Sequence, residues 1–180
     1  AQNRGVDFEA KSMQIQLENN LKKSIQLQWV FLLYLIRISE YDLIYHAKHS
    51  GKENSKLSGF IANHKLILTL QQHPMFKRRI QDYSVESFVD ASLVRKLYLE
   101  LIEKERFADF VKGDDLADAS ILAYILKKII GSSDPLEDHL AHHFINFIDD
   151  QFTIIQGLSK SFKTANAQEI ASFDDFFDEH

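Results

Sequence analysis

Residues 21 to 45 read LKKSIQLQWVFLLYLIRISEYDLIY and form the most apolar stretch of the chain. Apolar residues recur there at steps of three, four or seven, the spacing that lines one face of an α-helix, and they are Leu21, Ile25, Trp29, Leu32, Ile36 and Leu43. Every residue of 29–36 is apolar, which predicts a helical segment enclosed on all sides. We therefore expect a central helix over 14–48 that the rest of the chain covers.

A membrane-spanning helix is the alternative interpretation of this stretch. Spanning a bilayer needs about 20 consecutive apolar residues, whereas Gln28 and Arg37 close this run on either side. The first residues, AQNRGVDFEAKS, contain no apolar core of a secretory signal. The chain has no cysteine, which fits a reducing compartment. We therefore expect a cytoplasmic protein with no membrane partner.

The composition favours one all-α domain. A chain of 180 residues suits a single domain, and six glycines with two prolines are too few for a turn-rich β architecture. The lack of cysteine excludes disulfide frameworks and zinc-thiolate sites. A formal charge of −5 argues against a protein that coats nucleic acid by charge alone, but it leaves room for a local basic patch.

The predicted organisation has three parts. Residues 1–13 are polar and expected to form a flexible N-terminus, and 14–165 are expected to form the helical domain. Residues 166–180 form an acidic, aromatic tail ending in SFDDFFDEH. Within the domain we expect an irregular antiparallel bundle of about six helices around the central one.

The helices after the central one are predicted from caps and apolar spacing. Ser58 caps a second helix, in which Phe60, Ile61, His64, Ile67 and Leu68 share a face, and His73-Pro74 ends it. A short turn follows over 75–80. A third helix begins at Ser87 or Asp90, buries Leu93, Leu97 and Leu101, pairs Glu100 with Lys104, and is interrupted at Gly113.

Three further helices complete the prediction. The fourth buries Leu122, Ile125, Leu126, Ile129 and Ile130 and stops at Gly131. The fifth has Asp134 as its N-cap and Pro135 at its first position, and it buries Leu136, Leu140, Phe144, Phe147 and Ile148. The sixth begins at Asp149 or Asp150 and buries Phe152, Ile155, Leu158 and Phe162.

Histidine is the only candidate metal ligand that clusters in the sequence. His139 and His143 lie one helical turn apart, with His142 within reach of Asp138. Two ligands are half a site, and the Glu-x-x-His motif of di-iron bundles does not occur. His46 and His49, also about one helical turn apart, are a weaker candidate pair. Glycine-rich phosphate loops, G-x-S-x-G, H-E-x-x-H and EF-hand patterns do not occur, so we expect no cofactor.

The candidate binding residues are basic. Lys77, Arg78 and Arg79 are adjacent, and Arg95 and Lys96 follow on the next helix. Such cations can hold phosphates or an acidic partner. The alternative is a solvated turn that Met75, Phe76 and Ile80 anchor.

Three stretches carry a resemblance to a known family. They are HPMFKRRIQDY at 73–83, LVRKLYLELIEKERFADFV at 93–111, and PLEDHLAHHFINFIDDQFTII at 135–155 with GLSKSFK soon after. Together, over about 21–163, they resemble the long-form NusB transcription antitermination factors, which carry a helical region ahead of the usual NusB domain.

The resemblance implies an all-helical, non-enzymatic, cytoplasmic protein of transcription. Such a protein binds boxA RNA together with NusE, a ribosomal protein. The family's arginine-rich N-terminal helix has no counterpart in AQNRGVDFEAKSMQ, and its C-terminal helices do not follow residue 165, which implies a partial or truncated form. No family RNA-binding or NusE-binding residue therefore transfers to a position here.

Three hypotheses about function follow from the sequence. The first is a NusB-like, RNA-associated factor without catalysis. The second is a helical module that binds other proteins without nucleic acid. The third is a metal-dependent enzyme that uses His139 and His143.

Overall fold

A computed structural model describes residues 3–49 and 60–167, and within these ranges the chain is all-helical with no strand. The all-α prediction is therefore confirmed. The α-helices are α1 (Asn3–His49), α2 (Lys65–Gln72), α3 (Pro74–Asp82), α4 (Ala91–Ile102), α5 (Glu105–Gly113), α6 (Ala119–Tyr124), α7 (Asp134–Ala141) and α8 (Phe147–Ala167). A 3₁₀ helix, η1 (Val85–Phe88), and a π-helix, η2 (Ile125–Ile130), complete the described elements. The expected six helices were too few because breaks that sequence spacing does not reveal divide the chain further.

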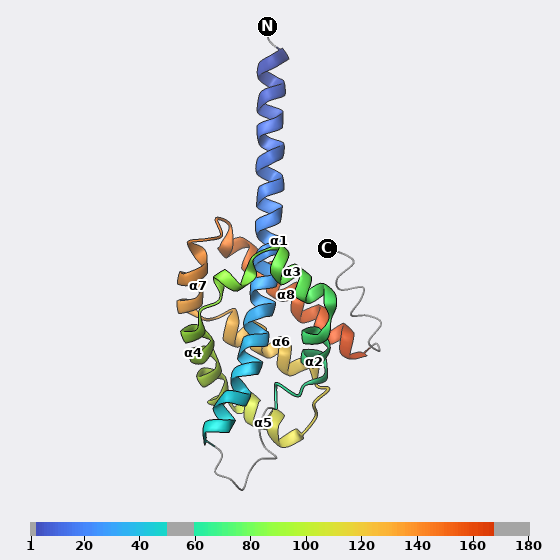
Figure 1. The fold of residues 1–180 in the computed structure, drawn as a ribbon, viewed down its shortest axis with the longest axis vertical. Coiled ribbons are helices and arrows are strands. Elements are labelled where there is room, and N and C mark those ends of the chain that lie inside the picture. The colour runs from blue at the N-terminus through green and yellow to red at the C-terminus, as the bar shows by residue number, and fades with distance from the viewer. Residues whose placement is uncertain (1–2, 50–59, 168–180) are drawn as a thin grey trace.

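Helix α1 is the centre of the fold, as predicted. It runs through the middle of the body, with α4 and α7 on one side and α2 and α3 on the other (Figure 1). All side chains of 29–36 are at most 2% exposed. Helices α4 and α8, together with η1 and η2, pack against it. The all-apolar run therefore lies in the core because helices surround it on every side.

The N-terminal part of α1 differs from the prediction. The helix begins at Asn3 instead of near Gln14, so the expected flexible segment is helical over 3–13. Side chains 7–23 are exposed, and this part of α1 projects beyond the body (Figure 1). We call residues 7–23 the stalk. Leu21, expected to face the core, is 63% exposed because the body covers α1 only from about Ser24 onward. Leu43 is 45% exposed and is also not a core residue.

Histidine side chains define the start of α2 and α3. His64 caps α2, its Nδ1 accepting the N–H of Leu66, so the helix begins later than expected; Ser58 lies outside the described residues. His73 ends α2 and caps α3 by accepting the N–H of Met75 at 3.2 Å. The segment 75–80, which we expected to be a turn, is therefore part of a helix, α3, which has Pro74 in its first turn. Leu68 is 38% exposed, so it does not share the buried face of Ile67.

The start of α4 and its break from α5 have local causes. Asp90 caps α4, and its Oδ1 accepts the N–H groups of Ser92 at 2.8 Å and Leu93 at 2.9 Å. Of the two predicted starts, Ser87 and Asp90, the second is therefore confirmed. The ion pair of Glu100 with Lys104 is present at 3.3 Å. The backbone of Lys104 is extended, and this ends the helix expected to continue toward Gly113 and begins α5.

Helix α6 passes directly into η2, a change of winding that apolar spacing does not predict. The N–H of Gly131 donates to the carbonyl of Leu126 at 2.8 Å, five residues back, which is the π-helical pattern. All the residues predicted to be buried on this helix are buried, and Gly131 ends it as predicted.

The last two helices show smaller corrections. The cap of α7 is Ser133, not Asp134, because the Ser133 Oγ accepts the N–H of Leu136 at 3.3 Å. Helix α8 begins at Phe147 instead of Asp149 or Asp150. Ile148 and Phe152, expected in the core, are 75% and 70% exposed. The acidic, aromatic segment of 168–180 lies outside the described residues.

Candidate functional site

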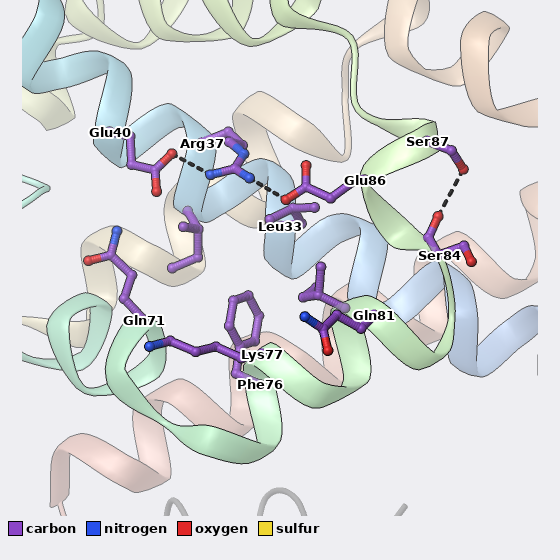
Figure 2. Close-up of a pocket in the computed structure, with 12 residues that line it drawn as sticks. Leu33, Arg37, Glu40, Gln71, Phe76, Lys77, Gln81, Ser84, Glu86 and Ser87 are labelled. Carbon is purple, nitrogen blue, oxygen red and sulfur yellow. Dashed lines mark hydrogen bonds and ion pairs between the residues drawn. The ribbon is translucent and has the colours of Figure 1, made fainter.

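A groove lies on the side of the body where α1 faces α3. Its volume is about 860 Å³, and α1, α2, α3, η1 and the residue before η1 contribute to its walls (Figure 2). The floor is apolar and consists of Leu33 and Ile36 from α1 with Phe76 and Ile80 from α3. Helical spacing explains the floor, since each helix contributes two residues three or four positions apart. The groove is of a size that binding sites in proteins use.

One wall of the groove is an ion-pair chain centred on Arg37. Its Nη1 donates to Glu40 at 2.6 Å, and its Nη2 donates to Glu86 of η1 (Figure 2). Burial works to lower the pKa of Arg37, but the hydrogen bonds and charges of the two glutamates outweigh it and raise that pKa. The guanidinium is thus already neutralised by the protein, and it ties η1 to α1.

The opposite wall holds a cation that has no ion-pair partner among the described residues. Lys77 is exposed, and its side chain extends along the groove toward Gln71 (Figure 2). No described carboxylate lies within ion-pair distance of its amino group. The neighbouring Arg78 turns away from the groove and lies 3.5 Å from Asp82 on the surface of α3. Of the three adjacent cations, Lys77 is therefore the one that lines the groove.

The structure separates the five predicted basic residues into two groups. Lys77 and Arg78 are exposed and Arg79 half-buried on α3, while Arg95 and Lys96 are exposed on α4. Helix α3 packs with α2 and η1, whereas α4 packs with α5 and η2, and α1 runs between them (Figure 1). The five cations therefore do not form one patch.

The histidines form no metal site among the described residues. His139 and His143 have ring centres 6.0 Å apart, but Nε2 of His139 is 3.0 Å from the carbonyl of Phe88, to which it donates. The ring of His143 packs edge-on against the Phe88 ring. Within 3–49 and 60–167 no three His, Cys, Asp or Glu side chains are grouped to hold an ion. His49 contacts the carbonyl of Tyr45 instead of a metal-site partner.

A buried acidic residue, Asp42, escaped the sequence analysis. Its side chain is 0% exposed and accepts three contacts: the Tyr98 hydroxyl at 2.6 Å, the Ile61 N–H at 3.0 Å, and Nε2 of His46 at 3.3 Å. These contacts join α1, α4 and the turn before α2. Burial and the Asp42 carboxylate raise the pKa of Tyr98. Its partners are all structural, so we assign Asp42 to holding the fold together.

The groove itself was missed for a different reason. Arg37 followed by Glu40 is a visible helical ion pair, but Glu86 and Lys77 come from segments that the sequence does not place beside α1. Only the packing of α3 and η1 on α1 brings them together.

Comparisons with protein-family models, curated proteins and solved structures find no match to this chain. Among the described residues, no helix is both long enough and apolar enough to cross a membrane. The groove and the exposed surfaces of this chain are therefore the basis for proposing a function.

Proposed function

We propose that this chain is a non-catalytic protein that binds an amphipathic segment of a protein partner in the groove between α1 and α3. The observation that carries the proposal is the combination of an apolar floor with one unneutralised cation, Lys77, on the rim. A helix laid in such a groove places apolar side chains on the floor and polar ones toward solvent.

The charges of the rim specify the partner further. Arg37 is neutralised by two glutamates, so it offers no charge to a ligand. Lys77 offers its charge to an acidic side chain of the bound segment, and the amides of Gln71 and Gln81 offer hydrogen bonds on the same rim. We therefore expect a segment with apolar anchors and a carboxylate near one end.

The experiment replaces Gln81 with a photoreactive amino acid and cross-links the chain in its own cells. The cross-linked peptide is identified by mass spectrometry, synthesised, and titrated against the purified protein. Lys77→Glu is expected to weaken its binding about tenfold, the effect of losing one charge-assisted contact. Lys112→Glu on α5, another exposed lysine but outside the groove, is the control and should leave the affinity unchanged. Equal affinities for the two variants would refute the groove as the binding site.

The resemblance to NusB proteins supports a second candidate, binding of boxA-type RNA together with NusE. The exposed cations on α3 and α4 are the residues that would contact phosphates. Because the two groups lie on different sides of α1, we expect only one group to contribute. If it is the α3 group, replacing Arg78 and Arg79 with glutamine weakens binding of a labelled boxA RNA and flattens its salt dependence, while replacing Arg95 and Lys96 does neither. RNA binding with an unchanged salt slope in all variants would exclude both groups.

A further inference from the structure

The stalk carries most of the exposed large apolar side chains of α1. Phe8, Met13, Ile15, Leu17 and Leu21 are between 59% and 77% exposed. A single helix of this length has little stability of its own in water, since helices in proteins are stabilised mainly by packing an apolar face. The stalk spans about 25 Å, long enough to pack against another helix over several turns.

One face of the stalk has the pattern of a helix-pairing seam. Ala10, Met13 and Leu17 follow one another at steps of three and four, as the a and d positions of a heptad do. Ile15 points to the opposite face, because it lies two positions from both Met13 and Leu17. The seam and the opposite face can therefore be tested separately.

We propose that the stalk pairs with the stalk of a second copy of this chain, antiparallel, around a two-fold axis near residue 15. The axis sits at the middle of the exposed segment, since 15 is the midpoint of 7 and 23. In this register Met13 of each chain packs against Leu17 of the other. The seam face of each stalk is then covered, while Phe8 and Ile15, seven residues apart on the opposite face, stay exposed.

Charge complementarity supports this register. Glu9, Gln16 and Lys23 lie seven residues apart on one flank of the seam. In an antiparallel pair this flank meets its own copy, so Glu9 of each chain faces Lys23 of the other and the two Gln16 side chains meet at the axis. The amino group of Lys23 already lies over the rings of Phe88 and Phe144, 5.9 and 5.5 Å from their centres, which holds it at the base of the stalk.

Packing excludes the parallel alternative. Paired helices lie about 8–10 Å apart, but from Leu27 through Ile36 almost every α1 side chain is buried under the body. Two parallel stalks would force the two bodies into the same space, whereas antiparallel stalks place them at opposite ends. Beside the base of the stalk, the exposed side chain of Ile145 lines a small cavity with Asn20 and Lys23, near the hydrogen bond of 2.6 Å from Ser24 to Asp150. It extends the apolar surface toward the end of the partner's stalk.

The first test measures dimerisation by sedimentation equilibrium up to about 100 μM, the range for an interface of this small size. We expect a monomer–dimer equilibrium for the wild type. Leu17→Ser removes two buried leucines per dimer and should raise the dissociation constant about 100-fold. Ile15→Ser, with similar exposure on the opposite face, should change it less than about twofold. A monomeric wild type, or equal effects of the two substitutions, would overturn the proposal.

The second test determines the direction of pairing. Because the chain has no cysteine, Gln16→Cys introduces a single thiol at the proposed axis, and a short bismaleimide should cross-link it into a dimer. Ser12→Cys, on the far side of the helix from the seam, should remain uncross-linked. Glu9→Lys should weaken dimerisation, and adding Lys23→Glu should restore it. Cross-linking at both cysteines alike, or no restoration by the charge exchange, would rule out the antiparallel arrangement.

Discussion

Replacing Asp42 with alanine tests how the fold holds its buried carboxylate. In the protein the Asp42 side chain is fully buried and accepts hydrogen bonds from the Tyr98 hydroxyl and the Ile61 N–H. Asp42→Ala leaves both donors buried without an acceptor. Each such loss costs about 1–3 kcal/mol, so we expect the free energy of unfolding to fall by about 4 kcal/mol in total.

Asp42→Asn is the matched control for this prediction. Its amide oxygen can accept from the Ile61 N–H, so that donor keeps its acceptor, whereas its NH₂ can only donate to the Tyr98 oxygen and leaves the Tyr98 O–H without one. We therefore expect a loss of about 2 kcal/mol, half of that expected for alanine. Urea unfolding followed by circular dichroism measures both variants. With a slope of about 2 kcal/mol per molar urea, alanine should lower the midpoint by about 2 M and asparagine by about 1 M.

The refuting result is equal destabilisation by the two substitutions. It would mean that the negative charge of Asp42, and not its acceptor capacity, stabilises the fold. The variant Tyr98→Phe adds a check: combined with Asp42→Ala, it should cost clearly less than the sum of the two single changes, because both remove the same hydrogen bond.

Three further predictions concern single residues. Burial lowers the pKa of His64, although the hydrogen bond to the Asp118 carbonyl opposes this, so the folded state disfavours the protonated ring. The free energy of unfolding should therefore fall as the pH drops below about 6.5. In urea titrations at several pH values, His64→Gln should reduce this dependence on pH, and His49→Gln at an exposed position should not. A methyl group on Gly131 would lie 2.8 Å from Cδ1 of Ile155 and 2.9 Å from the Leu126 carbonyl oxygen, whereas a methyl group on Gly157 would meet open space. In thermal melts we expect Gly131→Ala to be destabilised by about 1–3 kcal/mol. Gly157→Ala should be unchanged or stabilised by up to about 1 kcal/mol. Burial raises the pKa of Tyr34 to about 12, so the folded state keeps the phenol protonated. Its contribution to the free energy of unfolding is fully present below pH 10.0 and is lost as the pH rises toward 12. Tyr34→Phe should lessen this loss of stability at alkaline pH, and Tyr124→Phe should not.

Much of the helical plan could be predicted because it depends on neighbouring residues. The Asp90 cap, the break at His73-Pro74 and the stop at Gly131 all involve groups within a few positions of one another. The burial predictions that were wrong rested on local spacing, whereas burial itself depends on residues far away in the chain. Ile148 has the spacing of a core residue, yet it is exposed because no other described element packs over that face of α8.

The candidate site was predicted less well. The sequence singled out Lys77, Arg78 and Arg79 as basic residues, but it gave them equal weight. In the structure Lys77 lines the groove and Arg78 pairs with Asp82, a difference set by the direction in which each side chain leaves α3. The glutamate that completes the Arg37 wall comes from η1, 49 residues away along the chain, so no local pattern contains it.

The sequence by itself determined that this chain is helical and that residues 29–36 lie at its centre, because helical periodicity and an unbroken apolar run are properties of adjacent residues. Only the tertiary structure decided which apolar faces remain uncovered. Burial depends on the elements that pack from elsewhere in the chain, and those described contact the stalk only at its base, near Lys23. The same long-range packing of α3 and η1 against α1 made the groove, whose walls come from segments far apart in the chain, and this is why no local pattern contains it.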